Sequence, residues 1–590
     1  MAESPNRNAA AVKSRTGMPL WGHLPASNAA ALLRDLPIVV AALAVFYGLL
    51  ALTHYWTQPV NTQLPLTLTP GALPLYAMYS LARILVAYSI SLVFAIVYGQ
   101  VAAHNPRAER ILIPLLDTLQ SIPVLSFLPP VMAAMVALFP TRQFGVELGS
   151  ILLIFTGQVW NMAFSVYSST KNIPHELVEA AEIFRLNWWQ RFTQLEMPCA
   201  TIGLVWNSIM SVAGGWFFLM ACEAFVLGNS VRLPGLGSYL QTAADNDDMK
   251  SILWGLAAMI LVIVLMDQLV WRPIIAWAEK FKLEQVEATQ TPRSPILTLL
   301  RRSRVLSAIR HTAVEPARER IDLFFANKQA AAHARPPSRG TGRHWIGKTV
   351  AVAALLVVLY AVARMGMMLA TLSGHEVRDI FIGAGATFLR VLLALTLAGL
   401  WTIPVGVFIG LRPRLAALAQ PMAQIAASVP ATAVFPIVLL ALIRAGGGLG
   451  VGSIILMLLG TQWYILFNVI AGASAIPTDL KEVCSIYHVG RFERWRKLLL
   501  PGIFPFLITG FVTASGGAWN ASIVAEYSTI KHQTYSTIGL GAIISRATEQ
   551  GHVNVLLGAT VVMAALVVTV NRLFWRRMYG LASTRYKLES

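Results

Sequence analysis

The segment IPHELVEAAEIFRLNWWQRFTQLEMP at residues 173–198 returns 303 positions later as IPTDLKEVCSIYHVGRFERWRKLLLP at residues 476–501. The two copies align without a gap and share eight identities, which in the first copy are Ile173, Pro174, Leu177, Glu179, Ile183, Arg191, Leu195 and Pro198. Each copy is a polar, charged island between two long apolar stretches. We call these islands loop 1 (173–198) and loop 2 (476–501). A soluble segment duplicated inside an apolar chain indicates a docking element.

The composition is typical of an integral membrane protein. Of the 590 residues, 56% are hydrophobic and 13% are charged, and the mean hydropathy is +0.61. Apolar runs of roughly 20 residues cross a bilayer as helices. The net charge of +18 does not indicate nucleic-acid binding, because the excess Lys and Arg lie in one linker and in loops that we place in the cytoplasm. Cys199, Cys222 and Cys484 are too scattered for a disulfide framework or a metal site.

Twelve apolar stretches predict an all-α integral membrane fold with 12 transmembrane helices, six in each half. The spans are expected near 36–54, 76–102, 111–139, 147–169, 200–226 and 252–277, and near 348–371, 379–411, 416–443, 450–470, 503–527 and 554–575. The expected organisation is a cytoplasmic N-terminal tail (1–35), a first half (36–280), a basic cytoplasmic linker (281–347) and a second half (348–585). Within the linker, residues 296–309 form either a basic amphipathic helix on the membrane surface or part of a solvated tether.

The repeat extends beyond the two loops. Ser121-Ile122-Pro123 corresponds to Ser428-Val429-Pro430, and Gly235-Leu236-Gly237 corresponds to Gly539-Leu540-Gly541. The matched blocks follow the same order over roughly 75–280 and 380–585, which indicates a parallel duplication. Two such halves facing each other form a cleft between them. Lys and Arg in both loops place these loops inside, so that both termini of the chain are expected in the cytoplasm.

Each loop is predicted to begin with a short amphipathic helix. Apolar residues recur at i, i+3, i+4 and i+7, namely Leu177, Ala180, Ala181 and Phe184 in loop 1, and Leu480, Val483, Cys484 and Tyr487 in loop 2. Pro174 and Pro477 fit the start of a helix. A helix this short is not stable alone, so we expect a partner in the adjacent cytoplasmic space to order it.

Glu179-Ala180-Ala181, followed by a basic stretch that ends at Pro198, resembles the EAA loop of ABC importer permeases of type I. The resemblance covers both halves and is closest to the fused permeases of nitrate, sulfonate, taurine and bicarbonate systems. It implies a permease subunit, and not an enzyme, in a bacterial-type inner membrane. It also implies import of a small anion or organic sulfonate, two separate ATP-binding cassette subunits that carry ATP and Mg²⁺, and an extracytoplasmic substrate-binding protein that could deliver the cargo. The coupling residues would be Glu179, Ala180, Ala181, Phe184, Arg185, Glu482, Val483, Cys484, Tyr487 and His488.

Two departures from the family pattern concern these loops. The family usually has Gly four residues after the second Ala, where this chain has Arg185 and His488. We expect Asn187 and Gly490 to take the left-handed turn instead. Loop 2 also reads Glu-Val-Cys in place of Glu-Ala-Ala, and its bulkier residues would need a wider groove. The two docking sites are therefore expected to be unequal.

Polar residues inside the predicted spans are the candidates for the transport pathway. Proline interrupts the third span of each half after Ser121 and Ser428, and exposed helix ends at mid-membrane make ion sites. The pathway candidates are Arg83, Ser121, Gln158, Asn161, Arg390, Ser428 and Gln462. For Arg83 and Arg390 the alternative is a structural role, in which they hydrogen-bond helix ends. For Glu223 and Glu526 we expect a gating or helix-packing role, because an acid repels an anionic cargo.

Other motifs do not indicate chemistry in this chain. Residues 342–349 match the phosphate-loop pattern, but a polar linker precedes them and an apolar helix follows, so a nucleotide site is not expected. Neither a metal-ligand cluster nor a catalytic set is apparent in the sequence. The main alternative function is a secondary transporter of the major-facilitator type, which also has 6+6 spans. That class would not need a duplicated amphipathic loop between spans four and five.

Overall fold

The computed structural model describes residues 35–36, 39–40, 43, 48, 53–57, 66–140, 143–224, 233–281, 294–334, 343–446, 448–530 and 533–585. Most of these residues are helical, and the strands among them, β1 (Tyr527–Ile530) and β2 (Gln533–Ser536), form one antiparallel hairpin. The predicted α-helical class is therefore confirmed. The predicted N-terminal tail lies outside the described residues except for Asp35, and the predicted span 36–54 lies largely outside them.

The first half is built from long apolar helices joined by short ones. The long helices are α2 (Leu73–His104), α5 (Phe144–Lys171), α8 (Met197–Ala224) and α10 (Met249–Met266). The shorter helices are α3 (Pro106–Ser121), α4 (Leu128–Leu138), α6 (His175–Ile183), α7 (Trp188–Arg191), α9 (Leu236–Asp245) and α11 (Arg272–Ala278). The first half also contains 3₁₀ or π segments of three to five residues. They are η2 (Pro70–Ala72), η3 (Val124–Phe127), η4 (Phe192–Glu196), η5 (Asp267–Trp271) and η6 (Glu279–Phe281).

The second half repeats this order of elements. It contains α15 (Arg343–Leu369), α16 (Gly374–Gly410), α17 (Pro413–Ser428), α18 (Ala431–Arg444), α19 (Leu449–Ala475), α20 (Thr478–Ile486), α21 (Arg491–Arg494), η8 (Trp495–Leu499), α22 (Leu500–Ala525), α23 (Leu540–Glu549), α24 (Val553–Val570), η9 (Asn571–Trp575) and α25 (Arg576–Arg585). The π segment η4 of loop 1 recurs as η8 of loop 2, and η5 recurs as η9. The duplication thus extends to local irregularities of the helices.

Eight continuous helices in the described part of the chain are long and apolar enough to cross a membrane. They are Pro70–His104, Phe144–Lys171, Trp188–Ala224, Met249–Phe281, Gly374–Gly410, Leu449–Ala475, Arg491–Ala525 and Val553–Ala582. Four of them lie in each half. Helix α15 covers the expected span 348–371 and contributes a shorter apolar stretch, Leu359–Leu369. The total of twelve spans stays a prediction.

The expected third span of each half is broken at the predicted motif. Helix α3 ends at Ser121 and helix α17 ends at Ser428. The following residues, Ile122 and Val429, are extended, with ψ of 128° and 113°. The residue before a proline is disfavoured in the helical region, which accounts for both breaks. Each half therefore presents two helix ends inside the protein in place of one continuous span.

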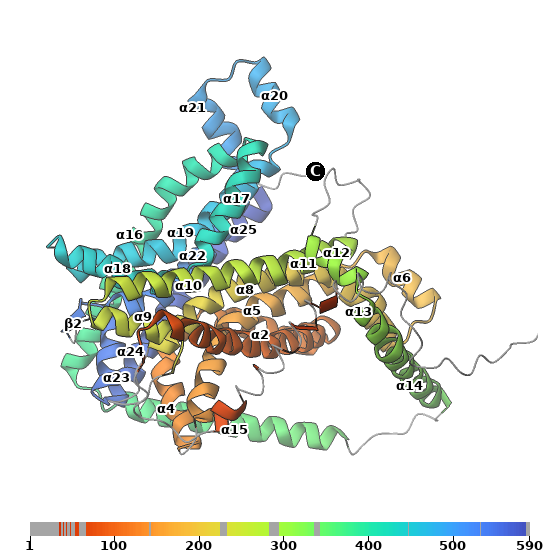
Figure 1. Ribbon diagram of the computed structural model, residues 1–590, viewed down its shortest axis with the longest axis horizontal. Coiled ribbons are helices and arrows are strands. Elements are labelled where there is room, and N and C mark those ends of the chain that lie inside the picture. The colour runs from red at the N-terminus through yellow and green to blue at the C-terminus, as the bar shows by residue number, and fades with distance from the viewer. Residues whose placement is uncertain are drawn as a thin grey trace, which may run out of the picture.

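The long helices of each half pack in the same pairwise order. Helix α2 packs along α5 and α5 along α8, as α16 packs along α19 and α19 along α22. Figure 1 shows the first-half helices running across the view and the second-half helices crossing them, with α6 and α20 far apart. The halves meet through α18 on α8 and through η3 on α22, where the Leu125 amide donates to Asn520 Oδ1 at 3.4 Å.

The linker is helical where the structure describes it. It contains α12 (Pro295–Arg302), α13 (Arg304–Ile309), the π segment η7 (Arg310–Val314) and α14 (Glu315–Ala334). Ser303 caps α13 and divides the predicted helix at 296–309 into two. Helix α14 lies beside loop 1 and packs on α7 (Figure 1). Residues 343–349 belong to helix α15, which excludes a phosphate-binding loop there.

Candidate functional site

A cavity with a mixed lining of polar, aromatic and small side chains lies between the two halves. Its volume is about 280 Å³, and residues of both halves line it. Its polar lining consists of Gln120, Asn161, Ser211, Thr513, Ser515, Asn520 and Asn571, and its aromatic lining of Phe217, Phe218, Trp463, Tyr464 and Trp575. The lining residues include no Lys, Arg, Asp or Glu among those that the structure describes. The cavity therefore offers neutral hydrogen-bonding groups and aromatic faces to whatever enters it.

The broken helices contribute directly to this cavity. Gln120, next to the end of α3, lines it from the first half. Val429 and Pro430, which follow the end of α17, line it from the second half. The helix ends at Ser121 and Ser428 thus lie beside the cavity, and their role in a transport pathway stays a prediction.

The other polar pathway candidates differ in whether they line the cavity or are buried in the protein. Asn161 lines the cavity, whereas Gln158, one turn earlier on α5, is fully buried against Gly215. Neither polar atom of the Gln158 side chain has a hydrogen-bond partner among the described residues. Gln462 is buried, and its neighbour Trp463 lines the cavity in its place.

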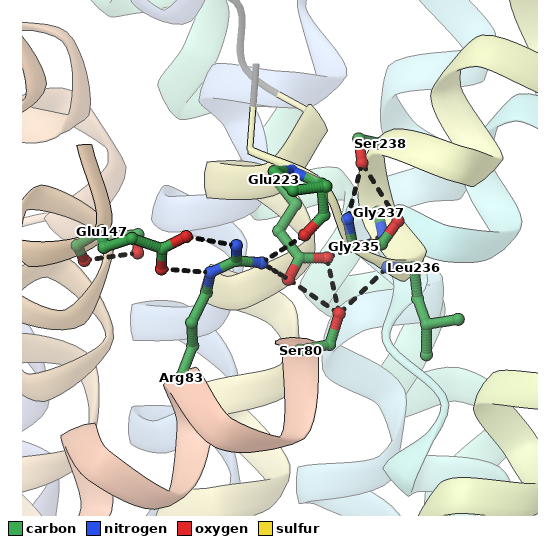
Figure 2. A network of polar contacts seen from close by, with 10 residues as sticks. Ser80, Arg83, Glu147, Glu223, Gly235, Leu236, Gly237 and Ser238 are labelled. Atoms are coloured by element: carbon green, nitrogen blue, oxygen red, sulfur yellow. Dashed lines mark hydrogen bonds and ion pairs between the residues drawn. The ribbon is translucent and has the colours of Figure 1, made fainter. Parts of the chain in front are cut away.

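Arg83 lies in a buried network of polar contacts (Figure 2), and it is not among the residues that line the cavity. Its Nε and Nη2 each donate to one oxygen of Glu147 at 2.6 Å, and its Nη1 donates to Glu223 Oε1 at 2.7 Å and to the Pro234 carbonyl at 2.8 Å. Ser80 Oγ also donates to Glu223 at 2.7 Å. All three charged side chains are at most 1% exposed. The network ties α2, α5 and α8 to the start of α9.

The second half repeats the network with one difference. Arg390 Nη1 donates to Glu526 Oε1 at 3.0 Å and to the Ile538 carbonyl, and Thr387 takes the place of Ser80. In both halves the carboxylate accepts from a backbone amide at the start of the following helix, from Gly237 to Glu223 and from Gly541 to Glu526. Arg390 has no second carboxylate partner among the described residues. Its Nη2 donates to Thr537 Oγ1 instead.

These contacts bear on the roles predicted for the buried charges. Neither Arg83 nor Arg390 lines the cavity, and both hold helix ends, which is the structural alternative stated for them. Glu223 and Glu526 each join three helices through their hydrogen bonds, which is a packing contact, and a gating role for them stays a prediction. Glycine is required beside them, because a Cβ at Gly235 would collide with the carboxylate of Glu223.

Glu147 is the residue that sequence reasoning missed. It is fully buried near the start of α5 and carries half of the ion-pair contacts of Arg83. A lone acid within an apolar span is itself a signal of function or pairing, and that signal was present in the sequence. Its counterpart at the spacing of 303 is Gly450, so the repeat did not draw attention to it.

Each loop presents an exposed apolar pair at the end of its first helix. Ile183 and Phe184 are 78% and 76% exposed at the end of α6, and Ile486 and Tyr487 are 71% and 77% exposed at the end of α20. Glu179 and Glu482, which the resemblance singles out, are exposed on the same helices. Exposed large apolar side chains at equivalent places on both halves indicate a protein-contact surface.

The prediction that Asn187 and Gly490 take the left-handed turn is wrong. Arg185 and His488 take it, each with φ of 50°. The next amide, of Leu186 or Val489, then donates to the carbonyl five residues back, at 3.0 Å in both loops. This bond closes the helix and requires a left-handed residue at the family's Gly position. Asn187 and Gly490 are extended and begin the next helix.

Two like halves of apolar helices with an uncharged cavity between them define a multi-pass membrane protein of internally duplicated type. Residues 91–270 and 402–586 each match the family described as binding-protein-dependent transport system inner membrane component. The chain belongs to this family and contains its conserved region twice. Both matched regions include one of the two loops, so the duplication inferred from the loops is confirmed.

Curated relatives have modest identity to this chain. The bicarbonate transport system permease protein CmpB of Synechococcus elongatus is 27% identical over 187 residues, which are 32% of this chain and 64% of that protein. The nitrate import permease protein NrtB of Leptolyngbya laminosa is 26% identical over 208 residues, or 35% of this chain and 69% of that protein. The putative aliphatic sulfonates transport permease protein SsuC of Bacillus subtilis is 23% identical over 286 residues, or 47% of this chain and 96% of that protein.

Proposed function

We propose that this chain is the membrane-spanning permease of an ATP-driven importer, with both permease halves fused in a 6+6 arrangement. Loops 1 and 2 each dock on an ATP-binding cassette subunit, which supplies ATP and Mg²⁺. Closure of the ATPase pair moves the loops and switches the central cavity between inward and outward access. The cargo is a small anion or an organic sulfonate, and an extracytoplasmic binding protein delivers it.

The observation that carries this proposal is the pair of exposed apolar tips. Ile183-Phe184 and Ile486-Tyr487 occupy the same place in the two halves and are more than two-thirds exposed. Each tip continues through a π segment into a long helix, α8 or α22, and residues of both helices line the central cavity. A displacement at either tip therefore reaches the cavity through the following turn, the short helix α7 or α21 and the long helix α8 or α22.

The cargo class is supported by the relatives and by the size of the cavity. The relatives are named for bicarbonate, nitrate and aliphatic sulfonates. A cavity of about 280 Å³ suits a small solute, being at the small end of ligand pockets. Backbone and side-chain amides are suitable donors for such anions without a fixed positive charge.

The test is substrate-stimulated ATPase activity of the reconstituted complex with Glu179→Lys and Glu482→Lys combined. We expect loss of stimulation, because both exposed acids face the docking partner. Asp379→Lys is the matched control, since Asp379 is 63% exposed at the start of α16 and outside both loops. Undiminished stimulation in the double variant would contradict the docking role.

A further inference from the structure

An apolar groove lies on the second half, outside the central cavity. Its volume is about 740 Å³, and α16, α22, α24, η9 and α25 form its walls. The lining is almost entirely aliphatic and aromatic, and it includes no Lys, Arg, Asp or Glu among the described residues. Leu392 and Leu400, which line it from α16, are 51% and 68% exposed. Because all these walls belong to helices that are long and apolar enough to cross a membrane, the groove opens toward the bilayer.

The first half has larger side chains at two positions of this groove. At the spacing of 307 that relates Arg83 to Arg390, the counterpart of Leu395 is Tyr88 and that of Gly399 is Leu92. Leu395 and Gly399 both line the groove. The loss of a phenol ring and of an isobutyl group leaves room in the second half that the first half fills with its own side chains.

A tryptophan shared by both halves shows the effect of this difference. In the first half Trp271 is buried, and the Tyr88 ring packs edge-on against it with centroids 5.9 Å apart. Its counterpart Trp575 is only half-buried and stacks on Phe511, with centroids 6.1 Å apart. Trp575 therefore exposes to the groove a surface of the kind that a neighbouring ring covers in the first half.

Trp575 also separates the groove from the central cavity. Trp575 and Ser515 are lining residues of both spaces, and Trp575 Nε1 donates a hydrogen bond to Ser515 Oγ at 3.3 Å. These two side chains form a thin partition. Whatever occupies the groove therefore contacts the wall of the central cavity from the membrane side.

Two exposed arginines lie at the end of the groove nearest loop 2. Helix α16 lines the groove as far as Pro404, and Phe408 follows one turn later. The Arg412 guanidinium carbon lies 3.7 Å from the centre of the Phe408 ring. On the last helix, Arg577 directly precedes the lining residue Met578. The apolar groove thus ends beside two cations.

Both arginines are particular to the second half. The counterpart of Arg412 in the first half is Asn105, and the counterpart of Arg577 is Pro273. The open groove and the two cations therefore occur together in one half. Basic side chains at the ends of membrane-spanning helices attract anionic lipid headgroups.

We propose that the groove binds an acyl chain of an anionic phospholipid, whose headgroup lies against Arg412 and Arg577. An empty groove facing the bilayer would forfeit dispersion contacts, and hydrocarbon is the material at hand to make them. Helix α16 lines the groove from Phe388 to Pro404, a rise of about 24 Å at 1.5 Å per residue, whereas one leaflet holds roughly 15 Å of hydrocarbon. The groove is thus long enough for a whole chain, which would support Trp575 in the partition. This proposal needs neither the cargo nor the ATPase of the proposed function.

Photo-labelling of the full-length chain in phosphatidylcholine liposomes tests the acyl-chain site. The probe is phosphatidylglycerol with a diazirine at the end of one acyl chain, and mass spectrometry locates the label. We expect label on the groove-lining parts of α16 and α22. Leu400→Trp, which puts an indole into the groove, should lower this labelling at least about fivefold by taking the space of the chain. Val93→Trp is the matched control, because Val93 is the first-half counterpart of Leu400 and is 64% exposed.

Two results of this experiment would overturn the proposal. One is the absence of label from the groove of the unmodified chain, which would show that something other than lipid covers it. The other is an equal loss of groove labelling with Leu400→Trp and with Val93→Trp, which would show that the label does not report on the groove.

A second probe tests the headgroup. Phosphatidylcholine with the same photoreactive chain replaces phosphatidylglycerol, and we expect at least about fivefold weaker labelling of the groove, because its headgroup has no net charge. Combining Arg412→Gln with Arg577→Gln should remove the preference, and both side chains are exposed, so that packing is kept. Arg378→Gln, which removes an exposed arginine at the opposite end of α16, should leave the preference unchanged. Equal labelling by the two probes in the unmodified chain would overturn the anionic site.

Discussion

Arg83 forms two parallel hydrogen bonds of 2.6 Å with Glu147, and the position equivalent to Glu147 in the second half is Gly450. The buried network of the first half therefore holds two carboxylates around one guanidinium. The network of the second half holds one carboxylate, and its arginine is 15% exposed. The two halves share a scaffold but differ in how much of their stability depends on one charged residue.

Arg83→Met is expected to destabilise the protein by about 3–5 kcal/mol, because it leaves two carboxylates buried without their cation. The loss of stability from Arg390→Met is expected to be smaller by at least ~1 kcal/mol. Only Glu526 loses an ion pair there, and Thr387 and the Gly541 amide still donate to its carboxylate. Thermal unfolding in detergent micelles measures the difference. Adding Glu147→Gln to Arg83→Met should recover part of the loss, and equal effects of the two arginine variants would contradict this account.

Gly235→Ala and Gly539→Ala are expected to disrupt the same networks. An added methyl group at either position would collide with the carboxylate of Glu223 or Glu526. We expect a loss of about 1–3 kcal/mol, the usual cost of overpacking. Gly385→Ala in α16 is the control, because its added methyl group would meet nothing within 4 Å and alanine favours a helix. If Gly385→Ala lowered the unfolding temperature as much as the other two substitutions do, the prediction would be refuted.

Arg185→Gly and His488→Gly are expected to stabilise the ends of helices α6 and α20. Both residues have φ of 50°, which costs a residue with a Cβ roughly 1 kcal/mol relative to glycine. Hydrogen exchange of the Leu186 and Val489 amides, which close the two helices, should slow by severalfold in the respective variants. The β-branched replacements Arg185→Val and His488→Val should speed exchange. A variant pair with unchanged exchange would show that the left-handed turn carries no strain.

Asn161→Asp and Asn520→Asp test the sign of the cargo charge. Both side chains line the central cavity, where the described lining has no charged residue. A new carboxylate should reduce uptake of an anion at least about tenfold, which corresponds to ~1.4 kcal/mol of repulsion. Asn161→Ser and Asn520→Ser keep a polar, neutral lining and are the controls. Unchanged or faster uptake in the Asp variants would indicate a neutral or cationic cargo.

Much of the fold was predictable because it depends on local physics. Apolar run length predicts membrane helices, and proline predicts the breaks after Ser121 and Ser428, where the structure ends α3 and α17. The candidate site was predictable only in part. Asn161 and Gln158 lie three positions apart on one apolar helix, and only packing against α8 decides that one lines the cavity and the other is buried.

The sequence by itself determined the membrane class, the duplication and the presence of two related polar loops, since hydropathy and repeated spacing are properties of the chain alone. Only the tertiary structure decided that Arg83 pairs with Glu147, 64 residues away, and that Phe325 of the linker packs on loop 1. It also decided that Arg185 and His488 take the left-handed turn. The first two features depend on contacts between segments that are distant in sequence. The third depends on the backbone hydrogen bond that closes each helix.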